Sequence, residues 1–530
     1  MDVRIDDAVR HAYRSAFTQA VADGRAKPLL LPYSLLGAPV LLILWLTIPH
    51  TRRPWLYQTR WLVLAFIIAF NWHVARESSS TNMACSYAAG LHAAWGIILS
   101  VDLLVWKRPQ FEAARAVRVL AVEPIEHVHA NGSATAAEPE SWKQNGLRRR
   151  TNDKSASLQD EPQAYPSGDR FVWQTFPADA PFWDRLGWAW DLASSFRGSG
   201  WNYSISSLPR PRIPSVVRSG EPVNLQSMPL VTGSGYRRHV SEAAFTLDRL
   251  SKVAILYLML DFLSVSMMKD PYFILGPDHA YDLPPRLARL PRWLLLLYRE
   301  VLSLGGFLSA IGAIFSLADL VQYWSLKALC PSRSALWFYS STFGSLNAVL
   351  DRGLAGWWGD WWHQTFRQQF MGPSTYLLQH GYLEKGSTTA KIVTMFVSFA
   401  QSGFLHAFGS MTTIPATKLW RSPAFFLLQG VGMLTQEKLA SLAKAHFPSP
   451  SRGLVRVTNA TFTIAWMYAT AWLFIDDIAS TGLWMLEPVP ISPLRWMGYG
   501  HPSDHWLRWD WDLLPKWHVG RHWWETGLAL

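Results

Sequence analysis

The sequence predicts an all-α, polytopic integral membrane protein with about eight transmembrane helices and a long, partly disordered polar loop. Three observations support this fold class. Hydrophobic residues make up 49% of the 530 positions and charged residues only 16%, against roughly 25% in soluble domains. The chain contains 30 tryptophans, a residue that favours the membrane–water interface. Several apolar stretches are also long enough to cross a bilayer as helices.

The net charge of +11 is spread through the loops and forms no compact basic motif. We therefore expect these charges to face an anionic membrane leaflet and not nucleic acid. The two cysteines, Cys85 and Cys330, provide neither a disulfide framework nor metal-ligand spacing. Residues 1–27 mix polar and charged side chains, so we expect the first apolar helix to act as a signal anchor.

Eight apolar segments reach or approach the length of about 20 residues that a helix needs to cross a bilayer. They are Leu29–Pro49, Trp61–Val74, Ala84–Trp106, Val253–Met268, Val301–Trp324, Ile392–Met411, Ala424–Leu442 and Ala460–Ile475. A last apolar element near Leu483–Met497 is interrupted by prolines. The sequence shows no internal repeat, which does not favour a duplicated transporter architecture.

These segments divide the chain into N-terminal helices (1–106), a polar loop (107–250), a transmembrane core (251–500) and a tail (501–530). Within the loop, residues 129–163 are rich in Ala, Ser, Glu, Asn and Asp and predict disorder. Residues 182–202 form an island of ordered sequence. There Trp188, Asp191 and Leu192 fall at i, i+3 and i+4, which predicts an amphipathic helix on the membrane surface.

The tryptophan-rich stretch Trp357–Arg367 is the most informative part of the chain. If residues 353–370 form one helix, a single polar stripe contains Asp360, His363, Gln364 and Arg367. Aromatic side chains cover the remaining surface, namely Trp358, Trp361, Trp362 and Phe366. Asp360 precedes His363 by one turn, where its carboxylate would orient the imidazole. The competing interpretation is an interfacial anchor helix whose histidine snorkels towards water.

A second histidine, His406, lies inside the otherwise uncharged segment Ile392–Met411. An ionisable side chain is costly there and usually has a function. Ser402 lies one turn earlier and would hydrogen-bond on the same face. A histidine can take a proton from an alcohol near neutral pH, and the bilayer excludes water that would compete for an acyl group.

The alternative for an intramembrane histidine is a structural role, satisfied by an interhelical hydrogen bond. We give this interpretation to His92, which lies in Ala84–Trp106 without a partner motif.

Two motifs in order carry a family resemblance. They are Trp358-Gly359-Asp360-Trp361-Trp362-His363-Gln364 and Ser402-Gly403-Phe404-Leu405-His406. They resemble the motifs of the fungal wax-synthase-like acyltransferases, distant relatives of the membrane-bound O-acyltransferase superfamily. Further similar segments are Phe343–Leu346, Arg185–Asn202 and Ile491–Arg495, so the resemblance covers about residues 180–500.

The resemblance implies transfer of an acyl group from an acyl-CoA to a hydroxyl, without a bound cofactor. It implies that His406 is catalytic and that Trp358, His363 and Gln364 shape the donor site. The motif departs from its relatives in two places, since a basic residue often stands where Asp360 is and plant wax synthases often have an acid where Ala407 is.

From the same motifs we expect His363 to assist catalysis by holding the donor or the developing oxyanion. Asp360, Trp361 and Arg367 complete the predicted donor site, and Ser402 supports His406. The phosphates of acyl-CoA are expected near loop arginines such as Arg352 or Arg367.

Fungal members of this type often acetylate terpenoids or meroterpenoids. The resemblance therefore implies an acetyltransferase of secondary metabolism, bound to the endoplasmic reticulum membrane, with acetyl-CoA and a hydrophobic alcohol as substrates. A long-chain wax or sterol ester synthase is the alternative within the enzymes, and a non-catalytic transporter is the alternative outside them.

Two histidine pairs have the spacing of metal ligands on a helix, His501 with His505 and His518 with His522. Pro502 opposes a helix at the first pair, and neither pair carries the glutamate of a metalloprotease motif. We therefore expect no metal site.

Overall fold

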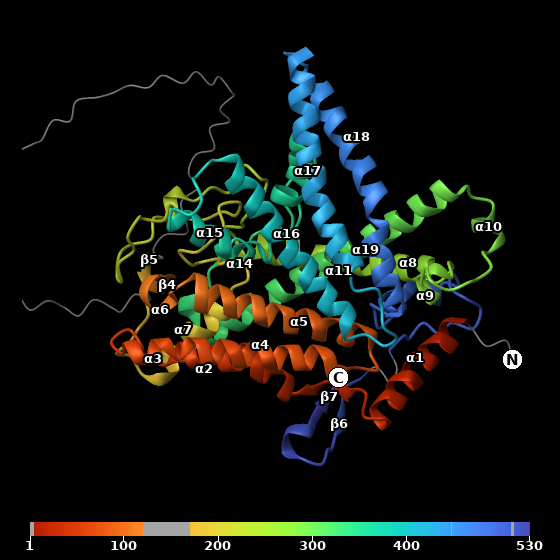
Figure 1. Ribbon diagram of the computed structural model, residues 1–530, viewed down its shortest axis with the longest axis horizontal. Coiled ribbons are helices and arrows are strands. Elements are labelled where there is room, and N and C mark those ends of the chain that lie inside the picture. Colours follow the sequence, from red (N-terminus) through yellow and green to blue (C-terminus); the bar gives the residue numbers. More distant parts are fainter. Residues whose placement is uncertain (1–4, 120–169, 447, 510–513) are drawn as a thin grey trace, which may run out of the picture.

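The computed structural model describes residues 5–119, 170–446, 448–509 and 514–530. The described chain is largely helical, as the sequence predicts, and its helices pack into one body from which α17 and α18 project together (Figure 1). Small strands lie at the edges of this body. The stretch 129–163, for which the sequence predicts disorder, lies outside the described residues.

The N-terminal region supplies three of the predicted apolar helices. The first begins as a π-helix (Leu36–Leu41), interrupted at Ala38 by a non-helical conformation before Pro39, and continues as α2 (Leu42–Thr47). The next two are α4 (Arg60–Glu77) and α5 (Met83–Val101), the latter continuing as a π-helix to Trp106. Helix α1 (Ile5–Ala22) precedes them, and α3 (Pro54–Gln58) and α6 (Pro109–Glu112) are short flanking helices.

The polar loop is partly ordered. Strands β4 (Arg115–Val119) and β5 (Arg170–Gln174) pair antiparallel with Arg115 opposite Gln174. The helix predicted in the island is confirmed as α7 (Phe182–Ser194), whose buried side chains include Trp188 and Leu192. This buried face packs against α2 inside the protein. The expected membrane-surface position of α7 stays a prediction.

The core region begins with an α-hairpin of α8 (Glu242–Met267) and α11 (Arg292–Leu329), joined through α9 (Tyr272–Leu275) and α10 (Pro285–Ala288). Buried Arg249 on α8 pairs with Asp319 on α11 at 2.9 Å and fixes the hairpin internally. The short helices that follow are α12 (Leu346–Arg352), α13 (Leu354–Gly356), α14 (Arg367–Phe370) and α15 (Gly372–Gln379). The remaining helices are α16 (Thr388–Met411), α17 (Arg421–His446), α18 (Arg452–Thr470), α19 (Trp472–Ser480) and α20 (Pro493–Trp496).

Four helical segments are long and apolar enough to cross a membrane among the described residues. They are Met83–Trp106, Glu242–Met267, Arg292–Leu329 and Thr388–Met411. Helices also occur at the other four predicted spans, but the total of eight transmembrane helices stays a prediction. The first of the four is 67% buried inside the protein and the other three between 28% and 33%. The α5 segment is therefore the most deeply buried of the four.

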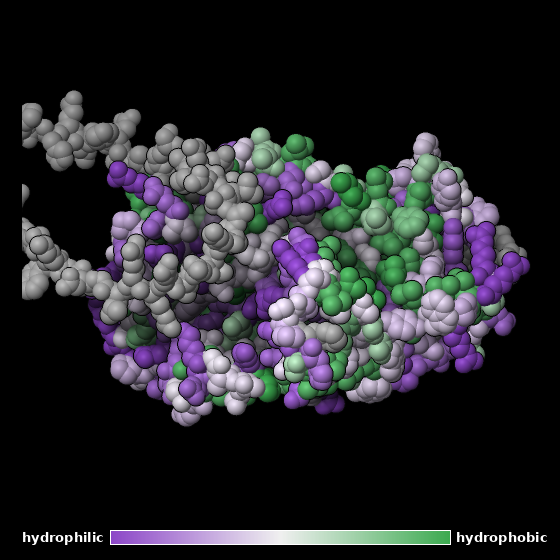
Figure 2. Space-filling view, turned by 90° about the horizontal axis from the view of Figure 1, so that it is seen from above, coloured by the Kyte–Doolittle hydropathy of each residue, from purple (hydrophilic) through white to green (hydrophobic). Residues whose placement is uncertain are grey.

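Large apolar side chains are exposed on the outward faces of α8 and α11. They include Leu247, Ile255, Leu258 and Phe262 on α8, and Val301, Ile314, Leu317 and Val321 on α11. Figure 2 shows hydrophobic residues gathered at the surface beside hydrophilic ones. In an integral membrane protein such apolar surface is covered by lipid.

The C-terminal tail is built into the fold. Strands β6 (Lys516–His518) and β7 (Gly527–Ala529) join β2 (Leu30–Leu31) in a sheet of order β2-β7-β6. A further two-stranded sheet pairs β1 (Lys27–Pro28) with β3 (Ser78–Ser79). The sequence did not predict these strands, because two or three residues carry no measurable periodicity.

Candidate active site

The tryptophan-rich segment is not one continuous helix, so the predicted helix over residues 353–370 is wrong. Helix α13 opens into a π-helix (Trp357–Trp361), and Trp362 then leaves helical conformation with a ψ of 148°. Helical structure resumes only at Arg367. A π-helix is wider than an α-helix, and together with the break it removes the predicted single polar stripe.

Hydrogen bonds from two polar side chains hold this bend. Gln364 donates to the backbone carbonyls of Trp358 at 3.0 Å and Trp362 at 2.6 Å. Arg367 donates to Gln364 Oε1 at 2.7 Å and to the carbonyl of Gly359. These donors satisfy carbonyls that the broken helix leaves without partners. Gln364 and Arg367 therefore shape the segment from within.

Asp360 does not orient His363, and that prediction is wrong. The carboxylate accepts a hydrogen bond from Ser234 Oγ at 2.7 Å and forms an ion pair with Arg352. The Nδ1 atom of His363 lies 3.1 Å from Thr365 Oγ1 instead. Asp360 thus anchors the tryptophan-rich segment to the loop that precedes α8.

His363 lies among aromatic rings. Ring centroids within 6.5 Å belong to Phe315, Phe343, Trp362 and Phe366. Burial lowers the pKa of His363 to about 3, and repulsion from His406 and Arg197 adds to this effect. The imidazole is therefore neutral near pH 7 and lies within electrostatic range of His406.

His406 is held on three sides. The ring of Phe426 on α17 stacks on it, with centroids 5.1 Å apart and planes at 13°, and Phe474 on α19 meets it edge-on at 4.9 Å. On a third side, Tyr87 Oη lies 3.0 Å from Nδ1. Even so, the side chain of His406 keeps part of its surface accessible, as does that of His363. An accessible imidazole in an aromatic setting can exchange a proton with a bound molecule.

Phe426 joins the two sequence motifs. Trp358 packs edge-on against Phe399 on α16 and against Phe425 and Phe426 on α17, with centroids 5.7 to 6.1 Å apart. The ring that contacts Trp358 is therefore the one that stacks on His406. The close approach of α16 and α17 requires glycine at position 403, because a Cβ added at Gly403 would lie 2.6 Å from Pro423 Cα.

The other predicted site residues occupy different positions. Trp361 is 8% exposed and stacks on Phe343, with centroids 5.9 Å apart, so it belongs to the core beneath the segment. Ser402 lies one turn before His406 on α16 and is half-buried. Arg352 has a side chain that is 59% exposed, whereas that of Arg367 is half-buried within the bend.

Sequence reasoning missed Tyr87, Phe426 and Phe474. Tyr87 precedes His406 by 319 positions, and no local spacing rule connects them. In the sequence, Phe426 and Phe474 cannot be distinguished from the other apolar residues of the predicted spans. For His92 the structural interpretation agrees with the contacts, because His92 Nε2 lies 2.8 Å from the carbonyl oxygen of Ala38.

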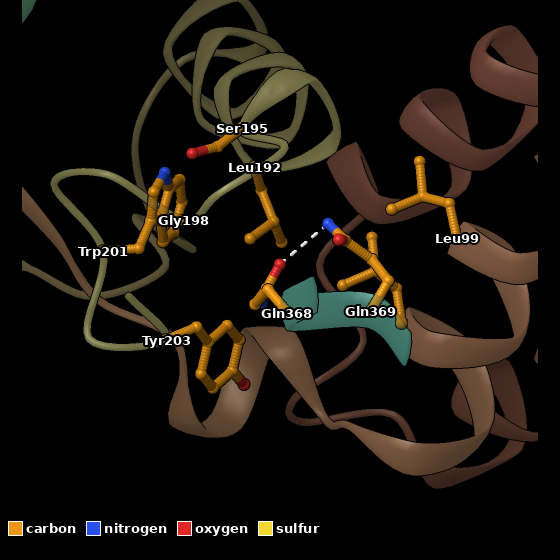
Figure 3. A pocket seen from close by; sticks show the side chains of 9 residues that line it. Leu99, Leu192, Ser195, Gly198, Trp201, Tyr203, Gln368 and Gln369 are labelled. Carbon is orange, nitrogen blue, oxygen red and sulfur yellow. Dashed lines mark hydrogen bonds between the residues drawn. The ribbon is translucent and has the colours of Figure 1, made fainter. Parts of the chain in front are cut away.

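Two hollows lie apart from these histidines. One, too narrow to hold a water molecule, is lined by α5, α7, the loop after α7 and α14 (Figure 3). At its edge Gln369 donates to Gln368 at 2.8 Å. The other is a cavity of about 430 Å³ at the C-terminal end of α16. It is lined by residues of α1, residues 25–26, residues 76–79 and residues 411–416.

The C-terminal histidines have local partners. His501 Nδ1 lies 2.7 Å from Ser503 Oγ, and His522 stacks on Trp524 with centroids 4.5 Å apart. Within the described ranges, no three side chains of His, Cys, Asp or Glu are grouped as metal ligands would be.

Residues 339–428 match the sequence model of the membrane bound O-acyl transferase family. This stretch contains both histidine motifs and the Phe426 that joins them. The resemblance to membrane O-acyltransferases is confirmed.

Two curated relatives are similar over longer stretches. The chain is 23% identical to O-Mevalon transferase macI of Penicillium terrestre over 48% of its own length and 53% of that protein. It is 23% identical to acetyltransferase sirH of Emericella nidulans over 56% of its own length and 60% of that protein. The chain thus aligns with little more than half the length of either relative. No solved structure matches it.

Proposed function

We propose that the protein is an O-acyltransferase that moves an acetyl group from acetyl-CoA to a hydroxyl of a hydrophobic terpenoid or meroterpenoid. The observation that supports this most is the accessible imidazole of His406, held by Phe426 and Phe474 and within electrostatic range of neutral His363. The family match supports the acyl-transfer chemistry, and the name of acetyltransferase sirH supports acetyl as the group.

In the proposed reaction, His406 Nε2 takes the hydroxyl proton while the alcohol oxygen attacks the thioester carbonyl. The C–O bond forms, the C–S bond breaks, and the CoA thiolate leaves with the proton returned from His406. His363 presents a neutral imidazole that donates a hydrogen bond to the developing oxyanion. Trp358 and Phe426 supply the rigid aromatic surface that keeps donor and base in register.

The two substrates are proposed to approach His406 from different sides. The tryptophan-rich segment packs against the middle of α16, where Trp358 contacts Phe399. The cavity of about 430 Å³ lies at the C-terminal end of α16, beginning at Met411. Its volume is in the range of small-molecule sites, and its mixed apolar and polar lining suits an oxygenated hydrophobic alcohol. We assign the donor to the tryptophan-rich segment and the acceptor to the cavity.

The test is an assay on microsomes that express the chain, with radiolabelled acetyl-CoA and a panel of terpenoid alcohols. We expect labelled ester from the wild type and a fall of at least about 100-fold for His406→Ala. Near-normal transfer by H406A would contradict the assignment of the base. His92→Ala is the matched control, since His92 is also on a membrane helix but bonds to a backbone carbonyl.

Assays on the same microsomes also distinguish the alternative functions. Long-chain acyl-CoA in place of acetyl-CoA distinguishes a wax or sterol ester synthase, and the name O-Mevalon transferase macI makes mevalonyl a further group to test. A transporter would move label without making ester. Fractionation of the microsomes tests the proposed location in the endoplasmic reticulum.

A further inference from the structure

His363 has a single hydrogen-bond partner among the residues that the structure describes. Its Nδ1 atom lies 3.1 Å from Thr365 Oγ1, whereas its Nε2 atom has no bond to the described part of the chain. The side chain of His363 is half-buried. Nε2 is therefore the ring nitrogen left for a bound molecule.

The backbone next to His363 is held in place, and with it the partner hydroxyl. The carbonyl of Trp362 accepts hydrogen bonds from Tyr236 Oη at 2.9 Å and from Gln364 Nε2 at 2.6 Å. Tyr236 is fully buried, and Gln364 and Thr365 are only 3% and 4% exposed. The hydroxyl of Thr365 consequently has a fixed place beside the imidazole.

The aromatic rings around His363 fix its plane but not the positions of its nitrogens. Phe343 and Phe366 meet the imidazole edge-on, each with centroids 6.4 Å apart, and Phe315 lies over a face at 6.5 Å. Phenyl rings carry no polar atom, so they do not distinguish a ring nitrogen from a ring carbon. A half-turn of the imidazole would exchange Nδ1 with Cδ2 and lose the bond to Thr365. Thr365 therefore selects one of the two orientations.

The hydroxyl of Thr365 is better satisfied as a donor than as an acceptor. Within the described ranges its one hydrogen bond is that to His363. If Nδ1 carried the ring hydrogen and donated it to the hydroxyl, the hydroxyl hydrogen would be buried without an acceptor. Burying an unsatisfied donor is costly. The stable arrangement has Thr365 donating to Nδ1.

This bond determines where the imidazole hydrogen lies. Burial lowers the pKa of His363 to about 3, so the ring is neutral near pH 7. A neutral imidazole carries one hydrogen. Because Nδ1 accepts from Thr365, that hydrogen is on Nε2. His363 thus offers a bound molecule a hydrogen-bond donor and not a base.

We propose that Thr365 is a positioning residue, which holds His363 in the Nε2–H tautomer and aims that hydrogen at the carbonyl oxygen of the acyl donor. This inference rests on the proposed function. Negative charge gathers on the carbonyl oxygen as the alcohol attacks, and a donor already in place stabilises it without reorganisation. The Nε2 hydrogen stays on His363 and the hydroxyl hydrogen stays on Thr365 throughout. Proton transfer belongs to His406 alone.

The test uses two substitutions of Thr365 and a matched control. Thr365→Val keeps the branched shape and removes the hydroxyl, whereas Thr365→Ser keeps the hydroxyl. The control is Thr463→Val on α18, because Thr463 is 1% exposed and its Oγ1 atom has no hydrogen-bond partner among the described residues. His363→Ala and the double variant H363A/T365V complete a mutant cycle, assayed on the same microsomes.

We expect kcat to fall about 100-fold in H363A, the size of effect seen when one oxyanion donor is lost. In T365V we expect a fall of about tenfold, because the donor remains but is no longer held in place. T365S should keep kcat within about threefold of the wild type and T463V within about twofold, with KM for both substrates changed less than about twofold throughout. T365V should have no further effect in the H363A background, since Thr365 acts through His363.

The outcomes separate this inference from the proposed function. Wild-type kcat in T365V, equal losses in T365S and T365V, or effects of H363A and T365V that multiply in the double variant would overturn the positioning role alone. Wild-type kcat in H363A would also overturn the role of His363 in the proposed reaction. A wild type that makes no ester from any donor would overturn the function itself. Melting curves in detergent accompany each variant, and a loss of kcat that T463V shares would refute the inference.

Discussion

The ring of Phe426 lies nearly parallel to the imidazole of His406, with centroids 5.1 Å apart. Phe426 also meets the edge of Trp358 at 5.9 Å. One aromatic side chain therefore contacts both sequence motifs, which are 43 positions apart between their histidines. The two motifs are joined through α17, which carries neither of them.

Replacing Phe426 with alanine should impair acyl transfer, although the phenyl ring itself takes no part in proton transfer. Loss of the stacked ring frees the imidazole of His406 to rotate, so we expect kcat to fall at least about tenfold, with Phe426→Tyr keeping most activity. Phe462→Ala is the control, because Phe462 stacks on Trp466 at 5.8 Å and 12° on α18. Equal effects of F426A and F462A on kcat would show that stacking at His406 has no special role.

Replacing Gln364 with alanine should destabilise the tryptophan-rich segment. The change leaves the carbonyls of Trp358 and Trp362 without their donor and Arg367 without one acceptor. Each lost buried hydrogen bond costs about 1 to 3 kcal/mol, so we expect a clear fall in the melting temperature and in transfer. Gln368→Ala, which loses only a bond to its neighbour Gln369, should melt near the wild-type temperature. A Q364A protein as stable as Q368A would disprove this account of the bend.

Filling the cavity at the C-terminal end of α16 should raise KM for the alcohol and leave KM for acetyl-CoA nearly unchanged. Ala416 is exposed at its lining, so Ala416→Trp narrows the space without disturbing buried packing. We expect KM for the alcohol to rise about fivefold or more and KM for acetyl-CoA to change less than about twofold. Ala288→Trp places the same bulk at an exposed position of α10. A416W kinetics that match A288W would exclude this cavity as the acceptor route.

Stability should fall in mild acid partly through His50. Burial lowers the pKa of His50 to about 4, whereas a histidine in the unfolded chain titrates near about 6.5. Between these values the unfolded state binds a proton that the folded state does not, so stability is lost as the pH falls through this window. We expect His50→Gln to lose less melting temperature than the wild type on going from about pH 7 to about pH 5. Exposed His446→Gln serves as control, and parallel pH dependences in all three proteins would refute the assignment.

The sequence predicted much of the helical architecture and both histidine motifs. Helices occur in all eight predicted apolar segments, although Leu29–Pro49 begins with strand β2 and is broken at Ala38; helices are the structure by which a long apolar run satisfies its backbone in a bilayer. The prediction failed at residues 353–370, where spacing alone cannot reveal a π-helix followed by a break. The sequence also predicted that Asp360 orients His363. The carboxylate of Asp360 instead binds Ser234 and Arg352, which lie outside the motif.

The groups around His406 were beyond sequence reasoning for a different reason. Tyr87 on α5 lies 319 positions before His406 on α16, and only the packing of those two helices makes them neighbours. A tyrosine in one apolar run and a histidine in another have no shared spacing. Their relation depends on glycines such as Gly409, whose value is visible only when the opposing ring is in place.

The crossing of α5 and α16 also has a consequence for biosynthesis. Tyr87 enters the membrane 319 residues before its partner exists, which at roughly 5 to 20 residues per second means a wait of about 15 to 60 seconds. During that time Ser79 on β3 and Ser86 and Tyr87 on α5 lack the partners that Thr412 and His406 later provide. These hydroxyl groups of the early segments therefore stay without their final hydrogen-bond partners until α16 has been synthesised.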